Sequence, residues 1–192
     1  MSMLEETMVV LGISLEIFGA MECQGSLVAK VEKKQLSVFC AVLAVGQALA
    51  LGMGDMLSLF LASHGTQDKK DFLGQVVAAS ILLILGIRLL FKAWRNEGIV
   101  ERREEKFEIR KFFRVYLRSI LFTFLAGVSL GFLGSSIAIL LLLTLFLTVL
   151  VTIVGMYTGY RLGFEHKMKA YVLGGILLVA GSVDVMVRYM QT

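Results

Sequence analysis

Six long runs of apolar residues, separated by short polar segments, make up most of the chain. Each run is close to the roughly 20 residues that an α-helix needs to cross the hydrocarbon core of a bilayer. The pattern predicts six transmembrane helices, over residues 8–28, 36–62, 72–94, 112–133, 137–160 and 170–189. The connection between the fourth and fifth helices is expected to be a very short turn, because apolar sequence resumes after only three residues, Gly134 to Ser136.

The longest hydrophilic segment divides the chain into similar halves. We predict a three-helix unit at 1–94, a charged cytoplasmic linker at 95–111 and a second three-helix unit at 112–192. The halves resemble each other, since residues 81–86 read ILLILG and residues 176–181 read ILLVAG. Three is an odd number of helices, so a second copy is inverted in the membrane, as in many secondary transporters.

The distribution of lysine and arginine predicts the orientation in the cell membrane. Fourteen of the 19 basic residues lie near the segments after the first, third and fifth helices, including a predicted basic loop over 161–169. The chain ends and the other two connections hold three, Lys69, Lys70 and Arg188. Since basic segments stay in the cytoplasm, both termini of this multi-pass protein are predicted to lie outside.

Composition and charge narrow the class of protein. With 57% hydrophobic residues, the chain is predicted to have the lipid bilayer as its main partner. The net charge of +4 would favour an anionic partner in a soluble protein, but here the basic residues set topology, so nucleic-acid binding is not predicted. No ATP-binding or nucleophile motif is present, so we predict neither an enzyme nor a cofactor. Assembly into a homo-oligomer is left open.

Four acidic residues inside the apolar runs are the candidate functional groups. Glu16 and Glu22 lie in the first run, Asp55 in the second and Asp184 in the sixth. A carboxylate at the centre of a bilayer costs roughly 2.5–3.5 kcal/mol on insertion scales, so such residues face a protein interior and often mark an ion or proton path. The alternative for Glu16 and Glu22 is a structural acid paired with an arginine.

Depth in the membrane assigns roles to these acids. Glu22 and Arg88 lie at compatible heights, in the inner parts of the first and third helices, and are predicted to form a structural ion pair. Glu16 lies near the middle, a turn or more from Arg88 and Arg118, so its predicted partner is a bound cation or a proton. The predicted metal site consists of Glu16, Asp55 and Asp184, with Gln47, Cys23 and Thr123 as neutral ligands. For the neutral residues, ordinary packing is the alternative.

Five segments are similar to parts of a known transporter family. GISLEIFGAMECQGS at 12–26 resembles a GMSMDAFAAS-type first helix, VGQALALGMG at 45–54 an FQALMPLIG-type second helix, and ILGIRLLFKAW at 84–94 an LGGRM-type third helix. GMYTGYRLG at 155–163, followed by VLGGILLVAG at 172–181, resembles the carboxyl end. Over nearly its whole length the chain resembles the MntP-type manganese efflux pumps. The resemblance implies six helices in two inverted repeats and export of Mn²⁺ through membrane-embedded acids.

The chain also departs from the family pattern. Glu16 stands where the family has an aspartate in the first helix, a conservative exchange for a hard cation, but Phe122 stands where the family repeats that aspartate in the fourth. The chain has no proline, which makes a kink in the second helix less expected. The predicted function is a secondary transporter that exports a divalent cation, with Mn²⁺ foremost. The alternatives are a non-transporting membrane scaffold or regulator and an exporter of another small solute.

Overall fold

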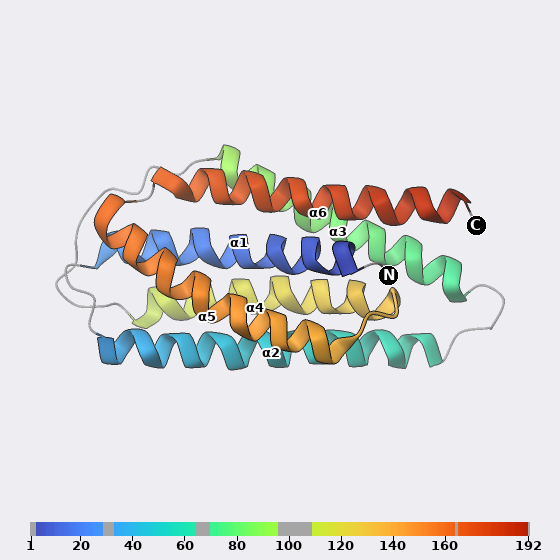
Figure 1. Cartoon of the computed structure of the whole chain (residues 1–192), viewed down its shortest axis with the longest axis horizontal. Helices are drawn as coiled ribbons and strands as arrows, with labels where there is room; N and C mark the ends of the chain where they lie inside the picture. Colours follow the sequence, from blue (N-terminus) through green and yellow to red (C-terminus); the bar gives the residue numbers. More distant parts are fainter. Residues whose placement is uncertain (1–2, 29–32, 64–69, 96–108, 164, 192) are drawn as a thin grey trace.

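A computed structural model describes residues 3–28, 33–63, 70–95, 109–163 and 165–191. These residues form a bundle of six helices that lie side by side (Figure 1). The helices are α1 (Met3–Leu27), α2 (Lys33–Ser63), α3 (Lys70–Trp94), α4 (Ile109–Phe132), α5 (Ile137–Leu162) and α6 (Glu165–Gln191). All six are long and apolar enough to cross a membrane, which confirms the predicted six-span helical architecture. Residues 96–108, most of the predicted linker, lie outside the described residues.

Several helices extend beyond their predicted ends. α1 begins at Met3 instead of residue 8, and α6 begins at Glu165 instead of residue 170. A helix satisfies its hydrogen bonds within its own backbone, so it does not have to end where the hydrocarbon core ends. The predicted basic loop over 161–169 is therefore wrong, because Lys167 and Lys169 lie in α6. Between α5 and α6 the chain turns at Gly163, whose φ of 76° favours glycine.

The two ends of the bundle are distinct. α1 starts and α6 ends at one end, which we call the terminal end, and α3 ends and α4 starts at the opposite end, which we call the linker end (Figure 1). α5 runs from the terminal end to the linker end, in the same direction as α1. Six helices that alternate in direction therefore leave both chain ends on one side of the bundle.

Helices from opposite halves of the chain pack against each other. The most extensive contacts join α1 to α5, α2 to α4 and α3 to α6. Glycines allow these helices to approach closely, as small residues commonly do in membrane proteins. A Cβ atom at Gly159 of α5 would overlap the backbone oxygen of Glu22, and a Cβ atom at Gly131 of α4 would overlap the Ser58 side chain. The two halves are thus interlocked.

α1 is the central helix of the bundle. It is the most buried of the six spans, with 72% of its most apolar stretch buried, whereas α5 is the least, with 22%. Large apolar side chains cover the outer faces of the other helices, for example Met56, Phe60 and Leu142. Such faces suit lipid, which needs no polar partner. Polar groups on α1 are consequently enclosed by protein.

Because Gly159 touches the backbone of α1, replacing it by alanine should force α1 and α5 apart. We expect Gly159→Ala to lower the stability of the purified protein by about 1–3 kcal/mol, as overpacked sites do. Gly52 is the matched control, because nothing lies within 4 Å of a Cβ atom at that position. Gly52→Ala should be neutral or slightly stabilising, since alanine is the better helix former. Equal unfolding midpoints for the two variants in detergent would contradict this packing.

The predicted orientation can be tested at the two ends of the bundle. After Cys23 and Cys40 are changed to alanine, single cysteines are introduced at Ser135, at the terminal end, and at Arg161, at the linker end. A membrane-impermeant thiol reagent added to intact cells should label the Ser135→Cys protein and leave the Arg161→Cys protein unlabelled until the cells are opened. The reverse pattern would place the basic segments outside.

Candidate functional site

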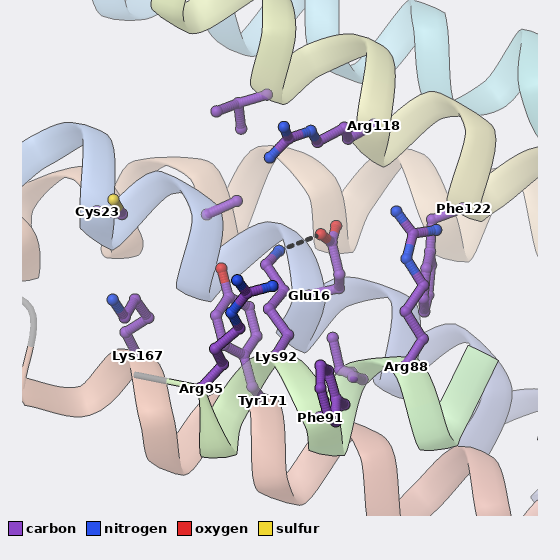
Figure 2. A pocket seen from close by; sticks show the side chains of 13 residues that line it. Glu16, Cys23, Arg88, Phe91, Lys92, Arg95, Arg118, Phe122, Lys167 and Tyr171 are labelled. Atoms are coloured by element: carbon purple, nitrogen blue, oxygen red, sulfur yellow. Dashed lines mark hydrogen bonds and ion pairs between the residues drawn. The ribbon is translucent and has the colours of Figure 1, made fainter. Parts of the chain in front are cut away.

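A cavity of about 390 Å³ opens between α1, α3, α4 and α6 (Figure 2). The cavity lies toward the linker end, because it is lined by Arg95, directly after α3, and by Lys167, in the first turn of α6. Polar, basic and aromatic side chains are mixed on its wall. The cavity is lined by Glu16, Ala20, Cys23, Arg88, Leu89, Phe91, Lys92, Arg95, Val115, Arg118, Phe122, Lys167 and Tyr171.

The Glu16 carboxylate forms an ion pair inside this cavity. Lys92 Nζ lies 2.9 Å from Glu16 Oε1, and the two side chains are 39% and 6% exposed (Figure 2). The Lys92 ammonium also lies over the ring of Tyr171, 4.3 Å from its centroid, where the ring face attracts a cation. The expectation that Glu16 has no fixed counter-charge is therefore wrong. The physical reason is the reach of lysine, whose four-carbon stem brings the ammonium back from the end of α3 to the depth of Glu16.

The second oxygen of Glu16 belongs to a hydrogen-bond chain between helices. The Ser119 hydroxyl donates to Glu16 Oε2 over 3.0 Å, and Gln47 Nε2 donates to Ser119 Oγ over 2.8 Å. Gln47 and Ser119 are buried, so these bonds form away from bulk water. One carboxylate thus connects α1 to α3 on one side and to α4 and α2 on the other. It is held by residues from both halves of the chain.

Several other buried oxygen atoms have no hydrogen-bond partner among the described residues. Gln47 Oε1 accepts no hydrogen bond from the described residues, and neither does the Thr123 hydroxyl, one turn beyond Ser119 on α4. On α5, three further buried threonine hydroxyls are also without hydrogen-bond partners among the described residues: Thr144, Thr148 and Thr152. A spacing of four places the α5 threonines on one helix face. Buried polar atoms are usually satisfied, so this concentration suggests that another species supplies the missing contacts.

Glu22 has a different neighbour from the predicted one. Its carboxylate accepts a hydrogen bond from the backbone N–H of His166 over 3.1 Å, and His166 Nδ1 lies 3.5 Å away. His166 is in the first turn of α6, where backbone N–H groups have no partner within the helix and favour a negative charge. The structure therefore does not bring Glu22 and Arg88 together. Because α6 begins earlier than predicted, its first turn supplies the backbone N–H of His166, which the predicted loop over 161–169 would not have positioned.

The six predicted metal ligands separate into two groups. Glu16 and Cys23 line the cavity, and Gln47 and Thr123 lie on the buried side of the same network. Asp55 and Asp184 are elsewhere: Asp184 is 48% exposed and lies 3.7 Å from Arg188 on its own helix, and Asp55 packs on α2 near Gly131. Within the described part of the chain, no group of three His, Cys, Asp or Glu residues has the geometry of a metal site.

The sequence pattern did not predict several residues of the site. Lys92 lies one turn after Arg88 on the same face of α3, and that spacing was the available signal. Ser119 and Lys167 gave no distinguishing signal, because a serine within an apolar run and a lysine near a helix end are common. Phe122, which replaces the aspartate that the resemblance implies, is buried and forms part of the cavity wall.

These features define a class of protein: a multi-pass helical membrane protein with a buried ionic network between its two halves. The comparison with family models identifies it further. The model of the family described as "Putative manganese efflux pump" matches residues 30–186, so the chain belongs to that family of transporters, which are not enzymes. This confirms the resemblance seen in the sequence. The matched range begins after α1, so Glu16 precedes it.

Individual relatives extend the comparison to nearly the whole chain. The chain is similar to "Putative manganese efflux pump MntP" of Mannheimia succiniciproducens, with 22% identity over 98% of both chains. It is 27% identical to the protein of that name from Aliarcobacter butzleri, over 71% of this chain and 77% of the relative. The corresponding protein of Methanothermobacter thermautotrophicus is 29% identical over 52% of both chains. No solved structure matches significantly.

The ion pair predicts a specific thermodynamic coupling. Lys92→Met leaves the Glu16 charge buried without its partner and should destabilise the protein by about 1–3 kcal/mol, between the values for buried and exposed pairs. In the double variant Glu16→Gln/Lys92→Met neither member of the pair is charged. Its loss of stability should therefore be clearly smaller than the sum of the losses in the two single variants. Arg114→Met, an exposed arginine outside the cavity, is the control and should be neutral. Additive losses in detergent unfolding would show that the pair is not coupled.

Proposed function

We propose that this protein is a secondary transporter that exports a divalent cation, with Mn²⁺ as the foremost substrate, and that the ion passes Glu16. The observation that carries the proposal is a buried carboxylate held by residues from both halves of the bundle. Ser119 and Gln47 place hydroxyl and amide groups beside it. Carboxylate, hydroxyl and amide oxygens are the ligands that a hard cation such as Mn²⁺ prefers.

The unpartnered threonines support a path from Glu16 to the terminal end. Gly155 of α5 faces the backbone oxygen of Phe18 in α1, and α1 and α5 run in the same direction. Thr152, Thr148 and Thr144 precede Gly155 at helical spacing and therefore lead from about this depth toward the terminal end. Their buried hydroxyls offer oxygen ligands that an ion could use one after another. Asp55 and Asp184 lie outside the proposed path.

The packing between the halves supports two inverted three-helix repeats. Exchanging the halves pairs α1 with α4, α2 with α5 and α3 with α6. Under this exchange the α1–α5 contact corresponds to the α2–α4 contact, and the α3–α6 contact corresponds to itself. Glycines on corresponding helices face corresponding partners: Gly155 of α5 lies against the backbone of α1, and Gly54 of α2 lies against the backbone of α4. In transporters built from inverted repeats, the substrate site lies near the midplane between the repeats. Glu16 and Ser119 lie near the middle of α1 and α4, which suits such a site.

Lys92 has a defined place in this mechanism. Its ammonium neutralises Glu16 when no metal ion is bound, which avoids an uncompensated charge in the protein interior. An arriving Mn²⁺ competes with the ammonium for the carboxylate, and departure of the ion lets Lys92 return. A ligand shifts a conformational equilibrium only through a difference in affinity between the states. Exchange of Lys92 for the metal ion provides such a difference.

The direction of transport follows from the proposed orientation. The excess of basic residues near the connections after the first, third and fifth helices supports a cytoplasmic linker end. The cavity beside Glu16 then opens toward the cytoplasm, and the threonines Thr152, Thr148 and Thr144 lead outward. Movement of an ion from the cavity past Glu16 and along these threonines is export.

We expect Glu16→Gln to abolish Mn²⁺ export, because the amide keeps the shape of the side chain but removes the charge that holds the ion. Glu16→Asp should retain part of the activity. The measurement is manganese tolerance and cellular manganese content in cells that lack their own exporters, at equal membrane abundance of each variant. Asp184→Asn is the matched control, since it removes a carboxylate from a membrane helix outside the path and should leave export unchanged.

The same experiment separates the alternative functions. Loss of export in Glu16→Gln but not in Asp184→Asn supports the transporter. Full manganese tolerance in the Glu16→Gln cells eliminates Glu16 as the ion site. A wild-type protein that changes neither tolerance nor manganese content favours a membrane scaffold or an exporter of another solute.

A further inference from the structure

The cavity wall is strongly basic. Five basic side chains, Arg88, Lys92, Arg95, Arg118 and Lys167, line the cavity together with one carboxylate, Glu16. That carboxylate is already paired with Lys92. Arg88 and Arg118 then have no carboxylate partner on this wall, so they attract an anion, and the attraction is strengthened because low-dielectric walls weaken the screening. A manganese path past Glu16 does not account for so many positive charges.

Two arginines stand out on this wall. Arg88 comes from α3 and Arg118 from α4, and Figure 2 shows their guanidinium groups within the cavity on either side of Glu16 in this view. Neither forms an ion pair with any residue in the described part of the chain. A guanidinium carries five N–H donors in a planar fork that matches the oxygens of a phosphate or carboxylate. Two such forks, from neighbouring helices on the wall of one cavity, have the donor groups that an oxyanion needs.

The depth of the cavity identifies where the anion can come from. Trp94, at the end of α3, is 85% exposed and suits the membrane interface. Arg88 lies six residues before it, about 9 Å along the helix axis. The cavity thus extends from the membrane interface at the linker end into the part of the hydrocarbon region nearest that interface. Basic pockets between transmembrane helices at this level are known to hold phosphate groups of lipids.

We propose that this cavity is a binding site for a phosphate-type oxyanion, held by Arg88 and Arg118 with Lys167 at its wall. The anion is either a free phosphate from the aqueous side or the phosphate of an anionic phospholipid. A volume of about 390 Å³ is within the range of small-molecule sites and is large enough for a phosphate group with part of a lipid glycerol. The site shares its cavity with the entrance of the proposed metal path, but it takes a ligand of opposite charge, and anion binding can be measured without manganese transport.

The test measures ligand-induced stabilisation of the purified full-length protein in detergent at constant ionic strength. The probes are inorganic phosphate, dihexanoyl phosphatidylglycerol and the zwitterionic dihexanoyl phosphatidylcholine. The variants are Arg88→Gln, Arg118→Gln and Arg88→Lys. Arg114→Gln, which removes an exposed arginine of α4 outside the cavity, is the matched control. Dissociation constants come from the shift of the unfolding midpoint with probe concentration.

We expect phosphate or phosphatidylglycerol to stabilise the wild-type protein and Arg114→Gln equally. Each glutamine variant should weaken that binding about tenfold or more, because a charge-assisted bond is lost. Arg88→Lys should weaken it less than Arg88→Gln, since the charge remains and only the fork is lost. If a glutamine variant does not fold, the Arg88→Lys variant is compared with the wild-type protein instead.

The probes also identify the source of the anion. Stabilisation by inorganic phosphate assigns a free oxyanion, and stabilisation by phosphatidylglycerol alone assigns a lipid headgroup. Equal stabilisation by phosphatidylcholine, or equal shifts in the wild-type protein and all arginine variants, would overturn the proposal, as would no shift with any probe. None of these results depends on manganese export, so failure of this proposal and failure of the proposed transport are distinguishable.

Discussion

The ion pair between Glu16 and Lys92 is the interaction on which the interior of this bundle depends. A carboxylate on the most enclosed helix would be strongly unfavourable alone, and Lys92 compensates for it from α3 while Ser119 satisfies its second oxygen from α4. The same contacts join the two halves of the chain at one point. Any motion of one half against the other therefore changes the environment of this carboxylate, as the proposed transport past Glu16 requires.

Glu22 shows a second solution to the same problem. It is fully buried, and the N-terminal turn of α6, which also carries Lys167, receives its negative charge. The carboxylate is held by a backbone N–H, and the closely packed glycines of α5 lie directly beside it. This arrangement attaches the start of α6 to α1. Glu22 and Glu16 thus have different roles: Glu22 anchors a helix, and Glu16 faces a cavity.

The two proposals meet at Lys92. An oxyanion in the basic cavity would attract the ammonium of Lys92 as well as the guanidinium groups of Arg88 and Arg118. It would thereby weaken the hold of Lys92 on Glu16 and lower the repulsion that a divalent cation meets in the cavity. Occupancy of the anion site would then favour metal binding, and by linkage a bound metal ion would favour the anion. Two oppositely charged ligands in adjacent sites could thus act together.

The sequence determined the six membrane helices and the family, because hydrophobic runs of sufficient length and local motifs are properties of neighbouring residues. It also singled out Glu16 as an important acid. Only the tertiary structure decided its partners. Lys92 was grouped with the basic residues that set topology, and Lys167 was assigned to a loop that belongs to α6. Which charges meet depends on helix rotation, on the reach of long side chains and on which helices are neighbours. These are set by packing between segments far apart in the chain, about which a single apolar run carries almost no information.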